Sequence, residues 1–285
     1  MTGHPPKAFV IGHPIAHSRS PLIHGHWLRT LGLAGSYERI DVPPAALAGF
    51  LAGFPAGGFV GGNVTVPHKE AVFTYLAESS QDLTPTARRL GAVNTLSLLP
   101  DGRLRGHNTD GAGFAASIDE AVGPGWEVGQ ALVVGAGGAA RAIVGALLDR
   151  GIPRIVVANR TLEKAQGLRV FAPDRIEAAG MDDLAGALAG TGLLVNTTTL
   201  GMKGQPALDI ALAPLPADAI VADIVYVPAE TPLLAAARSR GLRRVGGLGM
   251  LLHQAVPGFE SWFGRRPVVD AALRAVVEAD IGAAP

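Results

Sequence analysis

Three clusters of polar side chains in the first part of the chain could bind and convert a small polar molecule. They occupy residues 12–21, residues 63–69, and residues 91–95 together with 107–111. Lys69 ends the second cluster and follows a stretch, 42–67, that contains no Asp, Glu, Lys or Arg. We therefore expect Lys69 to lie against apolar surface. A protonated lysine in such a place can neutralise the charge that develops on a ketone oxygen and donate a proton to it.

Asp110, in the third cluster, is the expected partner of Lys69. A nearby carboxylate would hold the ammonium group in place and favour its charged form. Both residues are therefore predicted to be catalytic. The alternative is a salt bridge between two helix starts at the surface, an interaction that contributes little.

The other polar side chains of interest suit carboxylate and hydroxyl groups of a ligand. Ser18 and Ser20 offer two hydroxyls from one loop, an arrangement suited to a carboxylate, although Ser20 could instead cap the helix that Pro21 begins. Neutral donor–acceptors suited to the hydroxyls of a polyol are Asn63, Thr65, Asn94 and Gln254. The alternative for Asn63 and Asn94 is turn formation, and for Gln254 a solvent-facing position on a helix.

A glycine-rich turn between a predicted strand and a predicted helix indicates a dinucleotide site. The apolar run 131–134 leads into it, Gly135 permits the tight turn, and Gly137 leaves room for a pyrophosphate at the start of the helix. The residues predicted to contact the cofactor here are Gly135, Ala136, Gly137, Gly138 and Ala139. Because 38 of the 285 residues are glycine, an ordinary strand–helix turn is the alternative.

The end of the next predicted strand favours NADP over NAD. An NAD site places Asp or Glu there to bind the ribose 2′-hydroxyl, whereas this chain has Asn159 followed by Arg160. Lys164 follows one helical turn later, so two cations could bind a 2′-phosphate. Thr161 adds a hydroxyl, which could instead cap the helix. Lysine keeps the charge but lacks the planar fork of arginine, so Lys164 is the weaker contact.

The elements that must position these residues alternate between strands and helices. Strands are predicted at residues 8–12, 37–42, 58–65, 93–99, 103–107, 131–134, 154–158, 193–196 and 220–224. Helices are predicted at residues 20–31, 45–51, 68–76, 84–90, 110–118, 139–148, 231–240, 248–262 and 267–279. Apart from a hairpin formed by 93–99 and 103–107, this alternation implies parallel sheets, with the polar clusters at or near strand ends, where α/β proteins bind ligands.

Composition disfavours several other classes of protein. The formal net charge is zero, so bulk charge does not indicate a nucleic acid or an anionic membrane as partner. The absence of cysteine excludes disulfides, thiolate zinc sites and a cysteine nucleophile, and it fits the cytoplasm. Prolines and glycines interrupt the charge-free stretch 42–67, so we expect no membrane span there, and residues 1–7 show no signal-peptide pattern.

A metal site and a serine hydrolase are also disfavoured. His13 and His17 are four residues apart, and His24 and His26 are two apart, but no third ligand is spaced to join either pair. Ser18 lacks the Gly-x-Ser-x-Gly setting of a hydrolase nucleophile. We therefore expect no metal in the site.

The motifs, in their order along the chain, resemble the shikimate dehydrogenase family. They are the three polar clusters, the glycine turn, Asn159-Arg160-Thr161, Asp223-Ile224-Val225-Tyr226 and the segment 247–255. The resemblance covers essentially the whole chain and implies NADP-dependent interconversion of 3-dehydroshikimate and shikimate, a step of aromatic amino-acid synthesis. It implies that Lys69 and Asp110 line the reacting centre and that Ser18 and Ser20 bind the substrate carboxylate. It further implies that Tyr226 contacts substrate and that Gly247 belongs to the cofactor site.

The resemblance also implies two α/β domains with the active site in the cleft between them. We assign residues 1–109 and 247–285 to a smaller substrate-binding domain and residues 110–246 to an NADP-binding, Rossmann-type domain. The predicted helices after Gly247 have no strands of their own. They should therefore pack back on residues 1–109 and bring Gln254 near Lys69.

Several alternatives stay open at this point. Within the same class, the chain could be a quinate/shikimate dehydrogenase that uses NAD, or an aminoshikimate dehydrogenase. A non-catalytic dinucleotide sensor is a different class, but it would need neither Lys69 nor Asp110. A methyltransferase also uses a glycine turn, but it usually has an acidic residue near the position of Asn159. The sequence does not determine the oligomeric state, for which we consider a homodimer.

Overall fold

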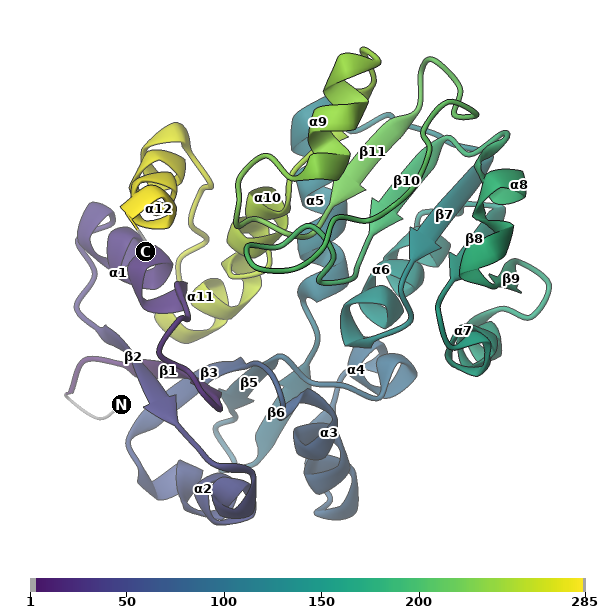
Figure 1. Ribbon diagram of the computed structural model, residues 1–285. Helices are drawn as coiled ribbons and strands as arrows, with labels where there is room; N and C mark the ends of the chain where they lie inside the picture. The colour runs from purple at the N-terminus through teal and green to yellow at the C-terminus, as the bar shows by residue number, and fades with distance from the viewer. Residues whose placement is uncertain (1–3, 284–285) are drawn as a thin grey trace. The chain divides into compact units, whose positions relative to one another are not determined.

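The computed structural model describes residues 4–283, which form two compact units. Unit 1 contains residues 4–109 and 254–283, and unit 2 contains Asp110–His253. Each unit is built on a six-stranded sheet of its own (Figure 1). Residues 1–3 and 284–285, which the sequence assigns to the substrate-binding domain, lie outside the described residues.

The sheet of unit 1 is mixed. Its strands are β1 (Lys7–Gly12), β2 (Ser36–Asp41), β3 (Phe59–Val64), β4 (Asp82–Leu83), β5 (Thr95–Leu98) and β6 (Leu104–His107). Their spatial order is β2-β1-β3-β5-β6-β4, and β5 runs antiparallel to both β3 and β6. The predicted hairpin is confirmed, and it accounts for the antiparallel pairs, because a hairpin reverses the chain without a crossover helix. The pairs β1–β2, β1–β3 and β4–β6 are parallel, as predicted.

Helices from both ends of the chain surround this sheet. They are α1 (Ser20–Thr30), α2 (Leu47–Gly53), α3 (Lys69–Glu78), α4 (Pro85–Leu90), α11 (Val256–Phe263) and α12 (Ala271–Ala283). α11 contacts β3 and β5, and α12 contacts α1, so the end of the chain packs on unit 1. The Trp262 indole donates to the carbonyl of Leu96 in β5 at 2.9 Å, which fixes α11 on the sheet.

The sheet of unit 2 is entirely parallel. Its strands are β7 (Gln130–Val134), β8 (Arg154–Ala158), β9 (Ile176–Ala179), β10 (Leu193–Asn196), β11 (Ile220–Asp223) and β12 (Arg243–Val245), in the spatial order β12-β11-β10-β7-β8-β9. The strand order reverses beside β7, the position at which open α/β sheets bind their ligands.

Helices cover both faces of this second sheet. They are α5 (Asp110–Val122), α6 (Gly138–Asp149), α7 (Leu162–Leu168), α8 (Leu184–Leu188), α9 (Pro232–Ser239) and α10 (Gly247–His253). Successive side chains of β7 point to opposite faces. Ala131 and Val133 pack with α5, α6 and α7, whereas Leu132 and Val134 pack with α8 and α9. These two apolar layers explain the uncharged sequence of the strand.

Two details differ from the sequence prediction near the end of the chain. The single helix expected at 248–262 is two helices, α10 and α11, with Pro257 in the first turn of the second. α10 contacts α5, and a Cβ atom on Gly247 would lie 2.1 Å from the carbonyl oxygen of Ile224. Because α10 packs so closely within unit 2, the chain returns to unit 1 at Gln254 rather than at the predicted position, 247.

Candidate active site

The three polar clusters lie at one edge of the unit 1 sheet. β1, β3 and β6 end at this edge, with Gly12, Val64 and His107 as their last residues. β5 runs the other way, so its first residue, Thr95, lies at the same edge and pairs with both Asn63 and His107. The loops that follow β1, β3 and β6 therefore meet the segment that precedes β5.

A buried hydrogen-bond network centres on Asn94, which is 2% exposed. Its amide nitrogen donates to the Thr109 hydroxyl at 3.0 Å, and its amide oxygen accepts from the Thr109 backbone N–H at 2.9 Å. The Thr109 hydroxyl also donates to the carbonyl of Gln254 at 2.8 Å. Thr109, to which the sequence assigned no role, thus connects Asn94 with Gln254 directly before Asp110.

Asn63 is 5% exposed and its amide is occupied by protein partners. The amide oxygen accepts from the Tyr37 hydroxyl at 2.6 Å, and the amide nitrogen donates to the carbonyl of Asn94 at 3.2 Å. The structure therefore favours a role for Asn63 in holding β3 against its neighbours. Burial raises the pKa of Tyr37 well above 10, so its hydroxyl stays protonated. Sequence patterns showed Tyr37 only as part of a strand.

The loop that carries Ser18 and Ser20 is held by side chains of β2. The Arg39 guanidinium donates to the carbonyl of Ser18 at 2.8 Å, and the Asp41 carboxylate accepts from the Ile15 backbone N–H at 3.2 Å. The two serine hydroxyls lie 3.3 Å apart. Ser20 is the first residue of α1 and makes no capping hydrogen bond, so the prediction that it caps the helix is wrong. Both hydroxyls are close enough to bind one carboxylate.

Lys69 is half-buried and begins α3. Its carbonyl accepts from the Val93 backbone N–H at 2.9 Å, which places the helix start beside Asn94. Thr65, also half-buried, accepts from the His68 backbone N–H at 2.9 Å through its carbonyl. The segment between β3 and α3 is thus a tight turn. Asp110 is 7% exposed and begins α5 in unit 2.

The glycine turn of unit 2 has the shape that a pyrophosphate requires. Gly135 has φ +110°, and a Cβ atom there would lie 2.5 Å from the Thr197 hydroxyl, so only glycine fits. Gly137 and Gly138 are exposed, and a Cβ atom on either would meet nothing within 4 Å. α6 begins at Gly138 without a side-chain cap, so its first N–H groups can bind an anion.

The four residues expected at the adenosine ribose follow β8. The Asn159 amide donates to the carbonyl of Thr161 at 2.8 Å, which shapes this turn. Arg160, Thr161 and Lys164 are exposed. Thr161 precedes α7 but makes no side-chain capping bond, so the alternative role as a helix cap is wrong. Two cations and a hydroxyl are therefore exposed here, together with the Glu163 carboxylate in the first turn of α7.

Tyr226 and Gly247 lie in unit 2, near the carboxyl end of β11. Tyr226 is half-buried and follows the strand by three residues. Gly247 is buried against the backbone of Ile224 and Val225, where a Cβ atom would meet carbonyl oxygens at 2.1 and 2.8 Å. Glycine at this position therefore lets α10 lie directly against the segment that carries Tyr226.

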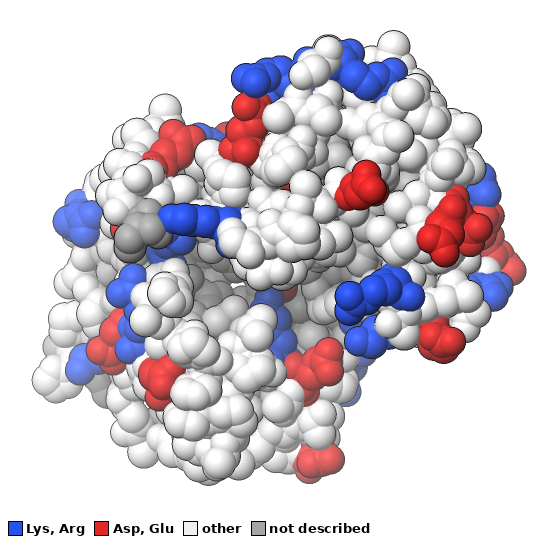
Figure 2. Space-filling model, in the orientation of Figure 1, with Lys and Arg blue, Asp and Glu red and all other residues white. Residues whose placement is uncertain are grey.

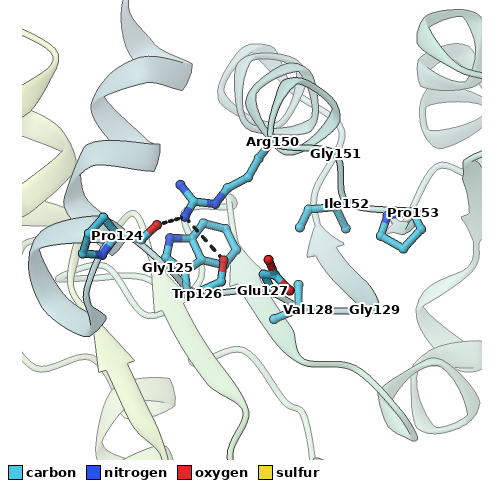
Figure 3. A pocket seen from close by; sticks show the side chains of 10 residues that line it. All are labelled: Pro124, Gly125, Trp126, Glu127, Val128, Gly129, Arg150, Gly151, Ile152 and Pro153. Carbon is cyan, nitrogen blue, oxygen red and sulfur yellow. Dashed lines mark hydrogen bonds between the residues drawn. The ribbon is translucent and has the colours of Figure 1, made fainter.

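A cavity of about 630 Å³ lies where the strands of the unit 2 sheet begin, at the edge opposite the glycine turn (Figure 3). It is lined by the residues that precede β7 and β8, such as Gly129 and Pro153. The Arg150 guanidinium stacks on the Trp126 ring at 4.1 Å and pairs with Asp119 at 2.9 Å. Because these polar groups bind one another, we assign no ligand to this cavity.

The surface carries mixed charge, and the visible face shows acidic and basic side chains interspersed (Figure 2). Among residues 4–283, no three His, Cys, Asp or Glu side chains are grouped so that they could hold a metal ion. None of the helices in that part of the chain is long and apolar enough to cross a membrane.

Three family models match successive parts of the chain. Residues 10–96 match the shikimate dehydrogenase substrate binding domain, residues 118–201 match shikimate / quinate 5-dehydrogenase, and residues 247–277 match the shikimate 5′-dehydrogenase C-terminal domain.

Curated relatives match over almost the whole chain. The NADP(+) shikimate dehydrogenase of Methylobacterium radiotolerans is 63% identical over 97% of this chain and 98% of that protein. The enzyme of the same name from Methylocella silvestris is 57% identical over 99% of both chains.

Solved structures also match over almost the whole chain. Shikimate 5-dehydrogenase from Thermus thermophilus in complex with NADP(H) and shikimate is 36% identical, with a TM-score of 0.84 over 96% of this chain and 99% of that chain. Quinate dehydrogenase from Corynebacterium glutamicum in complex with NAD is 31% identical, with a TM-score of 0.88 over 97% of this chain and 99% of that chain.

Proposed function

The chain belongs to the shikimate dehydrogenase family, and from this premise we propose that it catalyses the reversible, NADPH-dependent reduction of 3-dehydroshikimate to shikimate. This is a step of aromatic amino-acid synthesis. The observation that carries the proposal is the edge of the unit 1 sheet. There a hydrogen bond from Val93 to the Lys69 carbonyl holds the helix start beside Asn94, and the Ser18–Ser20 loop follows β1, which ends at the same edge. We propose that unit 1 binds the substrate and unit 2 binds NADP.

The side chains of unit 1 match the groups of such a substrate. The paired hydroxyls of Ser18 and Ser20 suit its carboxylate. Thr65, Asn94 and Gln254 are neutral and suit its ring hydroxyls. Asn63 contributes by holding β3 and Tyr37 in place, and Tyr226 of unit 2 adds a phenol. Neutral groups bind hydroxyls without the cost of burying an unpaired charge.

Unit 2 fits NADP at two places. The pyrophosphate fits the turn from Gly135 to Ala139, where α6 begins without a side-chain cap, and Gly247 supports the neighbouring segment. The 2′-phosphate fits Arg160, Thr161 and Lys164, which present two cations and a hydroxyl beside the neutral Asn159, with Glu163 the one carboxylate between residues 159 and 164. When bound, NADPH supplies the hydride that reduces the substrate carbonyl.

Lys69 and Asp110 provide the acid–base chemistry. As hydride reaches the carbonyl carbon, the carbonyl oxygen becomes negatively charged, and the Lys69 ammonium donates a proton to it. The reduced carbon then carries a hydroxyl, and Lys69 is left neutral. In the oxidation direction Lys69 accepts the hydroxyl proton. We propose that the Asp110 carboxylate favours the charged form of Lys69, as an acidic neighbour does.

The experiment that tests the proposal is an absorbance assay at 340 nm with shikimate and NADP. We expect NADPH to form with the wild-type protein and almost none to form with Lys69→Ala. Glu70→Ala is the matched control, since Glu70 is the next residue and is exposed. A wild-type protein that binds NADP but does not oxidise shikimate would favour a dinucleotide sensor.

We also propose the cytoplasm as the site of action and a homodimer as the assembly. The lack of cysteine in 285 residues and the bacterial relatives support the first proposal. Light scattering on the purified protein tests the second, for which a monomer mass of 29.2 kDa would be the contrary result.

A further inference from the structure

A buried carboxylate in unit 2, that of Asp223, has no role in the mechanism above. Asp223 is the last residue of β11 and is 2% exposed. One carboxylate oxygen accepts from the Asn196 amide at 3.0 Å and from the Val225 backbone N–H at 3.0 Å. The other oxygen accepts from the Thr231 hydroxyl at 2.7 Å. All three partners donate, so the side chain acts here only as an acceptor, which suits an ionised carboxylate.

Asn196 extends this network into the segment after β10. It is fully buried and pairs with Asp223 in the strand register. Its amide nitrogen donates to the carbonyl of Leu200 at 3.0 Å, and its amide oxygen accepts from the Thr198 backbone N–H at 3.1 Å and hydroxyl at 2.8 Å. The Asp223–Asn196 pair thus fixes the segment 197–200.

That segment lies directly against the glycine turn. The Thr197 backbone N–H and hydroxyl both donate to the carbonyl of Val134, at 2.9 and 2.7 Å. The same hydroxyl occupies the space that a side chain on Gly135 would need. Hydrogen bonds, together with the backbone of residues 196–198, therefore connect the glycine turn with Asp223.

Strand order shows which part of the cofactor these segments face. The glycine turn follows β7, and the proposed 2′-phosphate site follows β8, on one side of it. β10 and β11 lie on the other side of β7. A dinucleotide crosses the carboxyl ends of the strands with its pyrophosphate at the first turn. Its reactive end must therefore extend over the segments after β10 and β11, which include Tyr226.

We propose that Asp223 is a positioning residue for the reaction: it holds the Val225–Tyr226 backbone and the segment 197–200 where the reactive end of the cofactor and the substrate bind. The inference rests on the proposed function and adds a residue to it. Burial raises the pKa of Asp223, while its three hydrogen bonds oppose that shift. Burying the Asp223 carboxylate thus destabilises the fold. The constraint that this carboxylate places on two loops provides a reason for its presence.

Asp223→Asn is the direct test, because the amide keeps the size of the side chain but removes its charge and leaves one acceptor oxygen for three donors. We expect kcat/KM for shikimate to fall by about 10–100-fold, the loss typical of a small misplacement near reacting groups. The Kd of NADP should change less than about threefold, because the phosphate contacts lie elsewhere. Thr231→Val removes one of the three donors to Asp223, together with the bond that the same hydroxyl accepts from the Leu234 N–H at the start of α9. It should give a smaller kinetic loss in the same direction, and it provides the test if Asp223→Asn does not fold.

Thr191→Val is the matched control. Thr191 is fully buried and lies just before β10, at the opposite edge of the same sheet. Its hydroxyl donates to the carbonyl of Ala187 at 2.6 Å and accepts from the Gln130 amide at 2.8 Å. We expect this variant to lower Tm about as much as Thr231→Val but to leave kcat and KM unchanged. Kinetic losses as large in Thr191→Val as in the Asp223 and Thr231 variants would overturn the proposal.

Amide hydrogen exchange on the protein alone separates this inference from the proposed function. The N–H groups of Val225 and Thr198 should exchange faster in Asp223→Asn than in the wild type, and not faster in Thr191→Val. Unchanged exchange would contradict the positioning role. If the wild type did not oxidise shikimate, the proposed function would fail, and exchange would still show whether Asp223 holds these segments.

Discussion

Lys69 and Asp110 are the residues on which we propose that turnover depends most. Lys69→Ala and Asp110→Asn should each lower kcat by about 10²–10⁴-fold, the usual contribution of a positioned acid–base group. The KM for shikimate should change less, because we propose that Ser18 and Ser20 bind another part of the substrate. Steady-state kinetics with purified, folded variants provide the measurement. Near-normal turnover in either variant would show that the residue is structural.

Arg160 should decide which cofactor is preferred. Arg160→Ala should weaken NADP binding by about 1.5–3 kcal/mol, the range for hydrogen bonds to charged groups, and leave NAD binding nearly unchanged. Arg154→Ala is the control, because Arg154 lies at the other end of β8 and pairs with Glu177 at 2.6 Å. The ratio of kcat/KM for the two cofactors is the measurement, and equal losses with both would refute the charge argument.

His24 should make the stability of the fold depend on pH. Its ring is fully buried and stacks on the Tyr37 ring at a centroid distance of 4.0 Å, and burial lowers the pKa of His24 from 6.5 to about 3. The amide of Asn63 opposes this shift, yet neither ring nitrogen has a partner in hydrogen-bond geometry. Neutral His24 is therefore favoured in the fold.

The sign of the effect follows from proton uptake by the unfolded chain. Unfolded His24 binds a proton below about pH 6.5, whereas folded His24 does not until about pH 3. As the pH falls from about 6.5 to about 3, His24 should therefore lower the free energy of unfolding by about 1.4 kcal/mol for each pH unit. Urea unfolding at several pH values tests this, and His24→Phe should show a shallower slope. An identical slope in the variant would exclude His24 as the cause.

The sequence could predict the site only to the level of the clusters. Ser18, Lys69 and Asn94 are recognisable because polar residues after or before an apolar strand indicate a sheet edge. Tyr37 and Thr109 are not, because their roles come from partners 26 and 15 residues away, which only the fold brings together. Hydrogen-bond partners depend on register, and register does not follow from local patterns.

At the scale of elements, the glycine turn offers a matched pair of substitutions. Gly135→Ala should lower Tm, because its φ of +110° and the Thr197 hydroxyl 2.5 Å away both exclude a Cβ atom. Gly137→Ala should leave Tm nearly unchanged, since it has φ −85° and open space, but it should weaken NADP binding. Thermal unfolding and NADP titration test both variants. Equal losses of Tm would contradict this assignment of the two glycines.

The strands and helices that the sequence missed are β4, β9, β12, α7 and α8. β4 has two residues and β12 has three, two of them exposed arginines, so neither shows a strand pattern. The sequence also does not show the boundary between α10 and α11. Pro257 lies in the first turn of α11, where proline is compatible with a helix. Long buried strands such as β7 are predictable, since two apolar faces leave no polar position.

At the scale of the whole chain, the two-unit organisation places the candidate residues on separate sheets. The α/β fold and the Rossmann-type unit are confirmed by the all-parallel second sheet and by the related structures. The mixed character of the first sheet follows from the predicted β5–β6 hairpin. That hairpin brings Asn94 and Asn108 to the edge where β1 and β3 end.

The most direct test of NADP-dependent shikimate oxidation is one set of kcat/KM values from absorbance at 340 nm, for shikimate and quinate, each with NADP and NAD. The structural neighbours include a quinate dehydrogenase with NAD and a shikimate dehydrogenase with NADP(H), so both pairs must be measured. The exposed Arg160 and Lys164, together with the neutral Asn159, predict that shikimate with NADP gives the highest value. A higher value for quinate with NAD would contradict the proposed function.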